Sequence, residues 1–156
     1  MTDGLKYEVV KEFVEPGPQP VGVTEVQLRA KEQRWGLELL FAHTDGYTGK
    51  ILYRKADPTY KGRVQYHLQK AETFFLFSGE CLLRYDKGDG KLTVEKVSAG
   101  RSFHVPRGAR HSIIALTDCV FFEVSTPHFA DRVSADAEYG VEGEEDWHSI
   151  GDANPH

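Results

Sequence analysis

Short runs of alternating apolar and polar residues fill the middle of the chain, and turn-forming residues separate these runs about every ten positions. Valine, isoleucine, tyrosine and phenylalanine are frequent in the runs, whereas glycine, proline and aspartate interrupt them. Because successive side chains of a strand point to opposite faces of its sheet, this pattern predicts an all-β sandwich or barrel. We expect strands at residues 21–28, 36–42, 50–55, 63–68, 73–77, 81–85, 92–97, 103–105, 112–116 and 120–124.

The two ends of the chain differ from this middle part. Residues 15–20 read Glu-Pro-Gly-Pro-Gln-Pro and should form an extended connector, since proline donates no backbone hydrogen bond. Residues 5–14 fit either a strand or a short helix. The last residues are acidic and rich in turn formers. We therefore expect an N-terminal arm at 1–20, a barrel at 21–139 and an acidic, partly disordered tail at 140–156.

Length and composition exclude several classes of protein. A chain of 156 residues is of ordinary size for one domain. Its formal net charge of −5 speaks against nucleic-acid binding, and no apolar run approaches the ~20 residues of a membrane span. The first residues carry too many charges for a secretory signal. Cys81 and Cys119 lie in apolar runs, so we expect buried free thiols and a cytoplasmic location.

A set of metal-ligating residue types lies at spacings that strands can bring together. Gln65 and His67 are two positions apart, so on a strand their side chains leave the same face. Glu72 follows after a short turn and should lie beside His67 across a hairpin. His111 comes at the entry to a later strand, after the turn formed by residues 106–108.

These residues sit in two motifs that resemble those of the cupin superfamily. The first cupin motif usually opens with His-x-His, and this sequence is similar to it in Gln65-x-His67-x4-Glu72-x6-Gly79. The second motif resembles Gly100-x5-Pro106-x-Gly108-x2-His111. The resemblance implies a cupin double-stranded β-helix, a jelly-roll barrel, with extra N-terminal strands and a short irregular C-terminal tail.

The same resemblance implies one divalent metal ion, held by Gln65, His67, Glu72 and His111. Gln65 stands where most cupins carry histidine, and a Gln/His/Glu/His set resembles the zinc ligands of phosphomannose isomerases. The ligand types leave Zn, Mn and Fe open. In the opposing interpretation, the histidines are hydrogen-bonded core residues and Glu72 is an edge charge. An unpaired carboxylate inside a small barrel would be costly, which favours the metal.

A wider similarity points to sugar chemistry. Landmarks of the type II phosphomannose isomerase domain and of D-lyxose isomerase resemble, in order, Trp35-Gly-x-Glu38, Tyr47-x-Gly-Lys50, the metal motifs, Glu123-Val-Ser-Thr126 and Asp131-Arg-Val133. The resemblance implies a metal-dependent isomerase of a sugar or sugar phosphate, working by aldose–ketose conversion or epimerisation through an enediolate.

An isomerase needs a group that moves a proton between two carbons. Glu123, Lys50 and His104 are the candidates for this role, and Arg54 and Arg107 are candidates for binding the substrate. Glu123 can equally face solvent or pair with an arginine, and most lysines in Lys50's position lie on the surface.

Two other functions compete with an isomerase. His67, Glu72 and His111 would also suit an iron-dependent cupin dioxygenase, which uses two histidines and one carboxylate. A non-enzymatic module that binds sugars or other small molecules is the third hypothesis. In each case we expect a small-molecule partner, no nucleic acid and no membrane. Apolar residues on both faces of several strands predict a homodimer.

Overall fold

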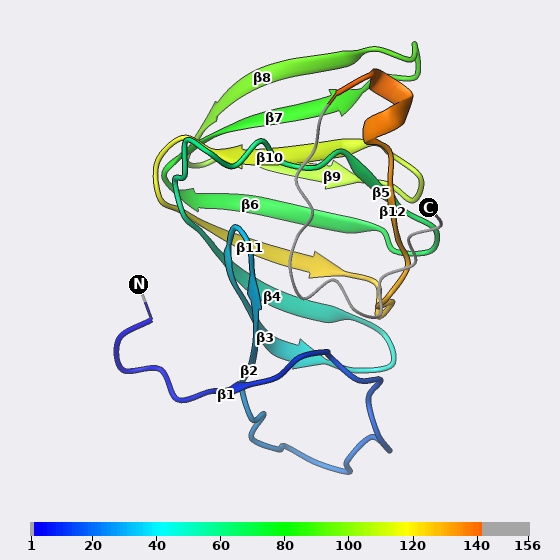
Figure 1. Ribbon diagram of the computed structural model, residues 1–156. Coiled ribbons are helices and arrows are strands. Elements are labelled where there is room, and N and C mark those ends of the chain that lie inside the picture. Colours follow the sequence, from blue (N-terminus) through cyan, green and yellow to red (C-terminus); the bar gives the residue numbers. More distant parts are fainter. Residues whose placement is uncertain (1, 142–156) are drawn as a thin grey trace.

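The computed structural model describes residues 2–141, which fold into two sheets that face each other (Figure 1). In order across the seven-stranded sheet lie β1 (Glu8–Val9), β2 (Arg29–Gln33), β3 (Gly36–His43), β4 (Thr48–Arg54), β11 (Cys119–Ser125), β6 (Glu72–Ser78) and β9 (Ser102–Val105). The five-stranded sheet contains β12 (Arg132–Ser134), β5 (Gln65–His67), β10 (His111–Ala115), β7 (Glu80–Asp86) and β8 (Leu92–Ser98). A short 3₁₀ helix, η1 (Asp136–Tyr139), follows β12. The all-β prediction is confirmed.

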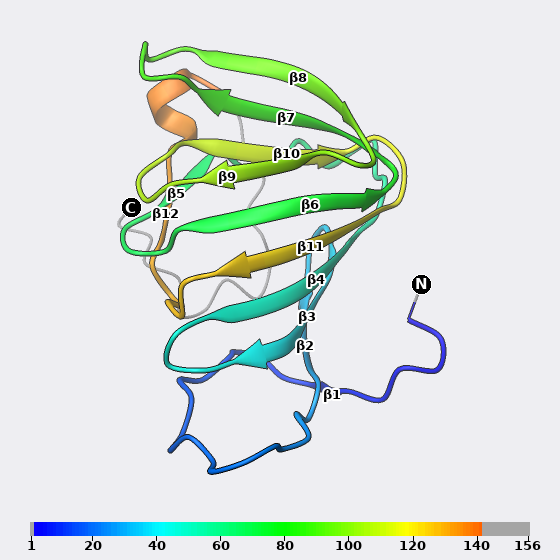
Figure 2. The ribbon, with the colours of Figure 1, turned by 180° about the vertical axis from the view of Figure 1, so that it is seen from behind.

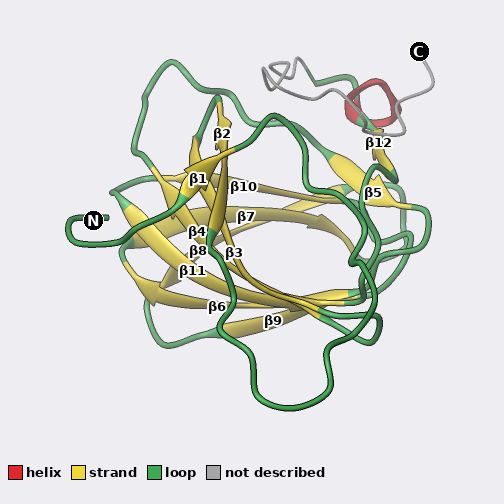
Figure 3. Ribbon diagram, turned by 90° about the horizontal axis from the view of Figure 1, so that it is seen from below, coloured by secondary structure: helices red, strands yellow, loops and turns green. Residues whose placement is uncertain are grey.

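The chain passes repeatedly from one sheet to the other. β4 and β6 belong to the seven-stranded sheet, whereas β5, which lies between them in sequence, belongs to the five-stranded one. Apart from the parallel pair β1–β2, all strand pairs are antiparallel. Seen from below, the strands of the two sheets lie on opposite sides of a barrel (Figure 3). Side chains from both sheets can therefore meet between them.

The alternating pattern of the sequence determines which side chains enter the barrel. In β11, Phe121 and Glu123 are buried while Phe122 and Val124 are exposed on the other face. Phe121 packs with Leu76 of β6 and with Leu83 and Ile113 of the facing sheet in one apolar cluster. Burial of these side chains drives the two sheets together. Cys81 and Cys119 are buried free thiols, as expected.

One expected strand is wrong. Residues 21–28 are an irregular, largely exposed segment, and Val21 and Val23 contact solvent fully. The strand begins only at Arg29, because Ala30 is the first residue there to be buried against the sheet. Alternating valines are not sufficient without a neighbouring strand to pair with.

The ends contain structure that the sequence did not reveal. Glu8 and Val9 pair with β2, which decides residues 5–14 in favour of a short strand. β12 and η1 lie in the region where the alternating pattern fades. Within residues 2–141, no helix is both long and apolar enough to cross a membrane. Residues 142–156 of the predicted tail lie outside the described residues, and the proposed boundaries at 20/21 and 139/140 stay predictions.

Candidate metal centre

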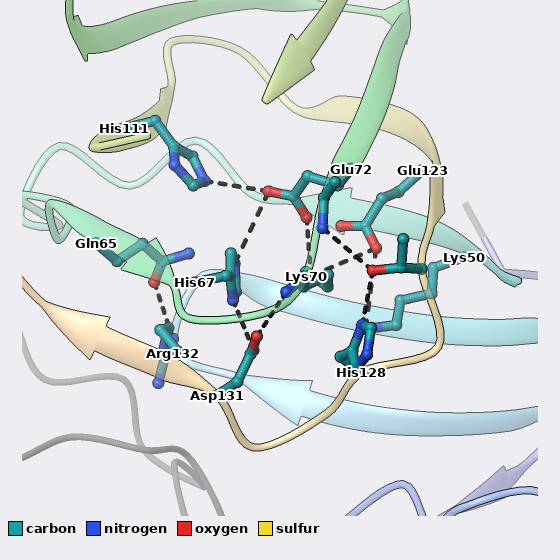
Figure 4. A network of polar contacts seen from close by, with 12 residues as sticks. Lys50, Gln65, His67, Lys70, Glu72, His111, Glu123, His128, Asp131 and Arg132 are labelled. Carbon is teal, nitrogen blue, oxygen red and sulfur yellow. Dashed lines mark hydrogen bonds and ion pairs between the residues drawn. The ribbon is translucent and has the colours of Figure 1, made fainter. Parts of the chain in front are cut away.

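Three of the four predicted ligands meet at one point inside the barrel. His67 comes from β5, Glu72 from the first position of β6 and His111 from the first position of β10. One ligand atom of each lies within 4.8 Å of the others, and all three residues are buried. Glu72 Oε1 lies 3.1 Å from His111 Nε2 and 3.9 Å from His67 Nε2 (Figure 4). The Glu72 carboxylate therefore lies between the two histidines and contacts both.

Hydrogen bonds on the far side of each imidazole fix which nitrogen faces Glu72. His67 Nδ1 lies 3.0 Å from the Asp131 carboxylate, and His111 Nδ1 lies 2.9 Å from the carbonyl oxygen of Ala109. Both partners only accept hydrogen bonds, so each neutral ring carries its proton on Nδ1. In a neutral ring, each Nε2 then has a lone pair free to bind a cation beside Glu72 Oε1. Two imidazole nitrogens and a carboxylate oxygen are common ligands of divalent metals, so the donor set fits such an ion.

Asp131 orients His67 from behind, and the sequence analysis assigned it no role. One carboxylate oxygen accepts from His67, and the other accepts the backbone N–H groups of Gln69 and Lys70 at 2.9 and 2.8 Å. Burial would raise the pKa of Asp131, but these hydrogen bonds outweigh it and hold that pKa well below its ordinary value. A carboxylate behind a histidine ligand is the usual support of a protein metal site.

The fourth predicted ligand, Gln65, stands beside this group. It pairs with His111 across β5 and β10 and lines the same cavity. Its Oε1 atom accepts a hydrogen bond from Arg132 at 3.3 Å. Figure 4 shows that this oxygen is turned towards Arg132 and not towards Glu72. Coordination by Gln65 therefore stays a prediction.

A buried chain of alternating charges extends from the carboxylate of Glu72. Lys70 Nζ lies 2.8 Å from Glu72 Oε2 and 3.7 Å from Glu123 Oε2. Lys50 Nζ lies 3.9 Å from the same Glu123 oxygen and is hydrogen-bonded to Glu38 Oε1. Both lysines are almost fully buried, so their charges depend on these carboxylates. The sequence analysis missed Lys70, and it named Glu38 only as part of a resemblance, without a role in the site.

Glu123 is the unusual member of this chain. Burial and the neighbouring charge of Glu72 raise its pKa to about 7, although Lys70 and Lys50 act in the opposite direction. Its Oε2 atom has no hydrogen-bond partner among the described residues. Burial would also raise the pKa of Glu38, but there the attraction and hydrogen bond of Lys50 prevail and lower it to about 2. One carboxyl can thus exchange a proton near neutral pH while the other stays ionised.

The other predicted site residues divide between the inside and the outside of the barrel. Lys50, Glu123 and Arg54 line one cavity of about 140 Å³ together with the three ligands. His104 and Arg107 are exposed and lie outside it. His104 falls between Phe103 and Val105, which point inwards, and instead contacts Thr73 on the outer face at 3.0 Å.

The N-terminal arm closes part of this cavity. Glu12 and Phe13 are among its lining residues, although the arm precedes the barrel by many positions. The ring of Phe13 lies 5.8 Å from that of Phe129, and the Lys50 ammonium lies 5.3 Å from the Phe13 ring and 5.2 Å from the Phe129 ring. Two aromatic rings and two carboxylates therefore surround Lys50.

Comparison with known proteins places this site in a known fold. No protein-family model and no curated protein matches the sequence. Among solved structures, the capsular polysaccharide assembling protein CapF from Staphylococcus aureus is similar, with 22% identity and a TM-score of 0.56 over 67% of this chain and 30% of CapF. Oxalate decarboxylase from Bacillus subtilis, which has Mn(II) centres, shows 17% identity and a TM-score of 0.53 over 68% of this chain and 30% of its own.

An RmlC-like cupin from Shewanella frigidimarina is similar over 59% of this chain and 76% of its own, with 16% identity and a TM-score of 0.50. These likenesses and the two facing sheets define the fold as the cupin double-stranded β-helix, which confirms the predicted fold class. Within this class, the chain carries a buried group of two histidines and one glutamate that suits a metal ion. The finer resemblance to sugar isomerases stays a prediction.

Proposed function

We propose that this protein is a metal-dependent cupin enzyme that isomerises a small carbohydrate, a sugar or sugar phosphate. The observation that carries the proposal is the position of Glu123. Its carboxyl group, with a pKa of about 7, is buried in the same cavity as His67, Glu72 and His111. A proton acceptor that titrates near neutral pH is what proton transfer between two carbons requires.

Three residues would hold the ion in this proposal: His67, Glu72 and His111. A bound divalent ion would supply positive charge that stabilises the oxyanion of an enediolate. Asp131 keeps the His67 ring in the orientation that exposes its Nε2 lone pair. Lys70 neutralises the Glu72 oxygen that faces away from the histidines.

Glu123 is the preferred base among the three candidates from the sequence. It would take a proton from one carbon of the bound sugar and return it to the neighbouring carbon. Lys50 is hydrogen-bonded to Glu38, whose pKa of about 2 keeps that carboxylate ionised, and it lies 3.9 Å from Glu123. Lys50 would therefore position Glu123 instead of accepting a proton. His104 lies on the outer face and has no access to the cavity.

The test combines metal analysis with turnover. Protein purified without a metal-affinity step is assayed for Zn, Mn and Fe, and then incubated with a panel of aldoses and ketoses in deuterated water. We expect deuterium to enter one substrate carbon, and Glu123→Gln to keep the metal while turnover falls by about a hundredfold or more. Glu95→Gln, a surface change, is the control. Metal-loaded wild-type protein that exchanges no deuterium with any sugar would contradict the isomerase.

An iron-dependent oxygenase is the second candidate, because two histidines and one carboxylate are the ligands of many such enzymes. Iron-loaded protein would then consume oxygen in the presence of its substrate, and Glu123→Gln would leave this consumption largely intact. Turnover without oxygen in the presence of zinc or manganese would exclude this candidate.

We further propose a cytoplasmic location and a homodimer. The buried free thiols of Cys81 and Cys119 suit a reducing compartment. Apolar side chains exposed on the outer face of the seven-stranded sheet support the dimer.

A further inference from the structure

The cavity beside the metal centre carries more positive than negative side chains. Six cationic residues line it: Lys31, Lys50, Arg54, Arg63, Lys70 and Arg132. The carboxylates that line it are Glu12, Glu38, Glu72, Glu123 and Asp131. A divalent ion would add to the positive excess. A ligand that fills this cavity would therefore be favoured by a negative charge of its own.

Two of these cations, Arg54 and Arg63, have little compensation from nearby acceptors. Arg63 is only 7% exposed, its Nη1 atom is buried without a hydrogen-bond partner among residues 2–141, and its Nε atom lies 4.0 Å from Asp136. Asp136 itself accepts hydrogen bonds from Val64 N and Ser134. The carboxylate of Asp136 thus compensates the Arg63 charge only weakly, because it lies 4.0 Å away and also accepts these two hydrogen bonds.

Arg54 has even less compensation. Its guanidinium carbon lies over Trp35, 4.0 Å from the ring centroid, and one nitrogen donates to the Ile113 carbonyl oxygen at 3.4 Å. Its Nε atom is buried without a partner in the described part of the chain. A buried N–H group that lacks an acceptor costs free energy, which a ligand oxygen would recover.

We propose that Arg54 and Arg63 form an anion subsite for a carboxylate or phosphate group of the substrate, an inference that rests on the proposed function of the neighbouring centre. Arg63, Gln65 and His67 all line the cavity from one stretch of chain. Four residues of chain, which span at most roughly 13 Å, separate Arg63 from His67. The subsite and the metal centre therefore hold opposite ends of one small acidic molecule. The subsite therefore favours a sugar acid or a sugar phosphate as the substrate over an uncharged sugar.

The experiment measures anion binding without relying on the metal. Metal-free protein is titrated calorimetrically with inorganic phosphate, with D-gluconate and with the uncharged analogue D-sorbitol. We expect phosphate or gluconate to bind and to raise the melting temperature, and sorbitol to bind far more weakly. Which of the two anions binds more tightly distinguishes a phosphate from a carboxylate substrate. Because no metal is present, failure of the proposed catalytic function leaves this result unchanged.

Substitution of the two arginines completes the test. Arg54→Met and Arg63→Met each keep an apolar side chain of similar length, and Arg101→Met, at a surface ion pair with Glu95, is the control. We expect about ten- to a hundredfold weaker anion binding in the first two variants and no change in the control. The ligand-free melting temperature should fall little in Arg63→Met, since the ion pair removed there, with Asp136, is 4.0 Å long. Anion binding that is equal in all variants, or sorbitol binding as tight as gluconate binding, would overturn the proposal, as would wild-type protein that binds neither anion.

Discussion

At the scale of single residues, one carboxylate links the two halves of the site. Glu72 Oε1 faces both imidazoles, while its Oε2 faces Lys70, which in turn lies near Glu123. In the proposed function, metal binding and proton transfer therefore share Glu72. Substitution of Glu72 should therefore impair both metal binding and proton transfer, whereas substitution of Glu123 should impair proton transfer alone.

Glu72→Gln should remove most of the bound metal. The variant keeps the shape of the side chain but loses the negative charge that Oε1 directs at the histidines, so we expect metal affinity to fall by more than about tenfold. Competition titration with a chelating dye measures the affinity, and elemental analysis measures the content. Glu80→Gln, at an exposed ion pair with Lys96, should bind metal like the wild type. Unchanged metal content in Glu72→Gln would refute the assignment of the site.

Glu123→Gln should change how stability depends on pH in metal-free protein. The folded pKa of about 7 exceeds the ordinary value of 4.5, so between these values only the folded state keeps the proton. Wild-type stability from this group is therefore full below pH 4.5 and is lost as the pH rises through 7. The variant lacks this loss, and its stability relative to wild type should grow by on the order of 1–3 kcal/mol between pH 5 and pH 8. Urea denaturation at each pH measures the difference, and a constant difference would count against a raised pKa.

His67 gives a second pH effect, with the opposite sign. Burial and nearby Lys70 lower the pKa of His67 to about 4, despite the hydrogen bond to Asp131. The imidazole therefore stays neutral and able to coordinate well below its ordinary value of 6.5. Its contribution to stability is full above pH 6.5 and is lost as the pH falls towards 4.

At the scale of elements, the turns that precede and follow strands place the site. Gly79 ends β6 in a left-handed conformation, with φ of 93°, and a Cβ atom there would lie 2.4 Å from the Asp118 carbonyl oxygen. The turn from β6 to β7 thus depends on glycine both for its backbone conformation and for the close approach of a neighbouring loop.

Gly79→Ala should destabilise the barrel by about 2–4 kcal/mol, because the added methyl group meets backbone atoms and the Cys119 sulfur. Gly88, in the turn between β7 and β8, has a similar φ of 103° but open space around it. Gly88→Ala should therefore cost only the conformational strain, about 1–2 kcal/mol. Urea denaturation of both variants separates the two contributions. Equal losses of unfolding free energy in the two variants would show that the close contact at Gly79 does not contribute to the loss.

The strands could be predicted from the sequence where a two-residue alternation coincides with partners on both sides. β3, β4, β6, β7 and β11 meet that condition. Residues 21–28 alternate too, but no strand is available to pair with them, and local pattern carries no information about that. The same alternation could have excluded His104, since both its neighbours are needed in the core.

The meeting of His67, Glu72 and His111 could be predicted from the motif spacing, whereas the residues that support them could not. Lys70 lies in a turn and resembles a surface lysine. It is buried because Asp131, sixty-one positions away, accepts its backbone N–H. Contacts over such sequence distances come from the fold and leave no local signal.

At the scale of the whole molecule, the outer face of the seven-stranded sheet is only partly covered. Tyr7 and Leu28 pack against Leu39 and Tyr53 at one side of this sheet. Farther along, Phe77 and Val124 are 58% and 60% exposed on β6 and β11, which lie side by side in Figure 2. Phe77 also contacts Phe122, at a centroid distance of 5.2 Å. This apolar surface is where we expect a second copy to bind.

Light scattering coupled to size exclusion should give twice the mass of the chain at micromolar concentration. The double variant Phe77→Lys and Val124→Lys should elute as a monomer, because two charges on each copy would be buried in the interface. Val94→Lys, an equally exposed position on β8, should remain dimeric. A wild-type monomer would disprove the dimer without affecting the site.

The arm that carries Phe13 has a consequence for how the protein can be shortened. A chain cut back to residue 21 would keep every strand that supplies a metal ligand, and should still fold and take up the ion. It would nevertheless lose the ring that shields Lys50, so water would reach the lysine and the carboxyl group next to it. Such a shortened protein would be a barrel with an unprotected interior, in which the carboxyl group proposed as the base has reverted towards the acidity of an ordinary glutamate.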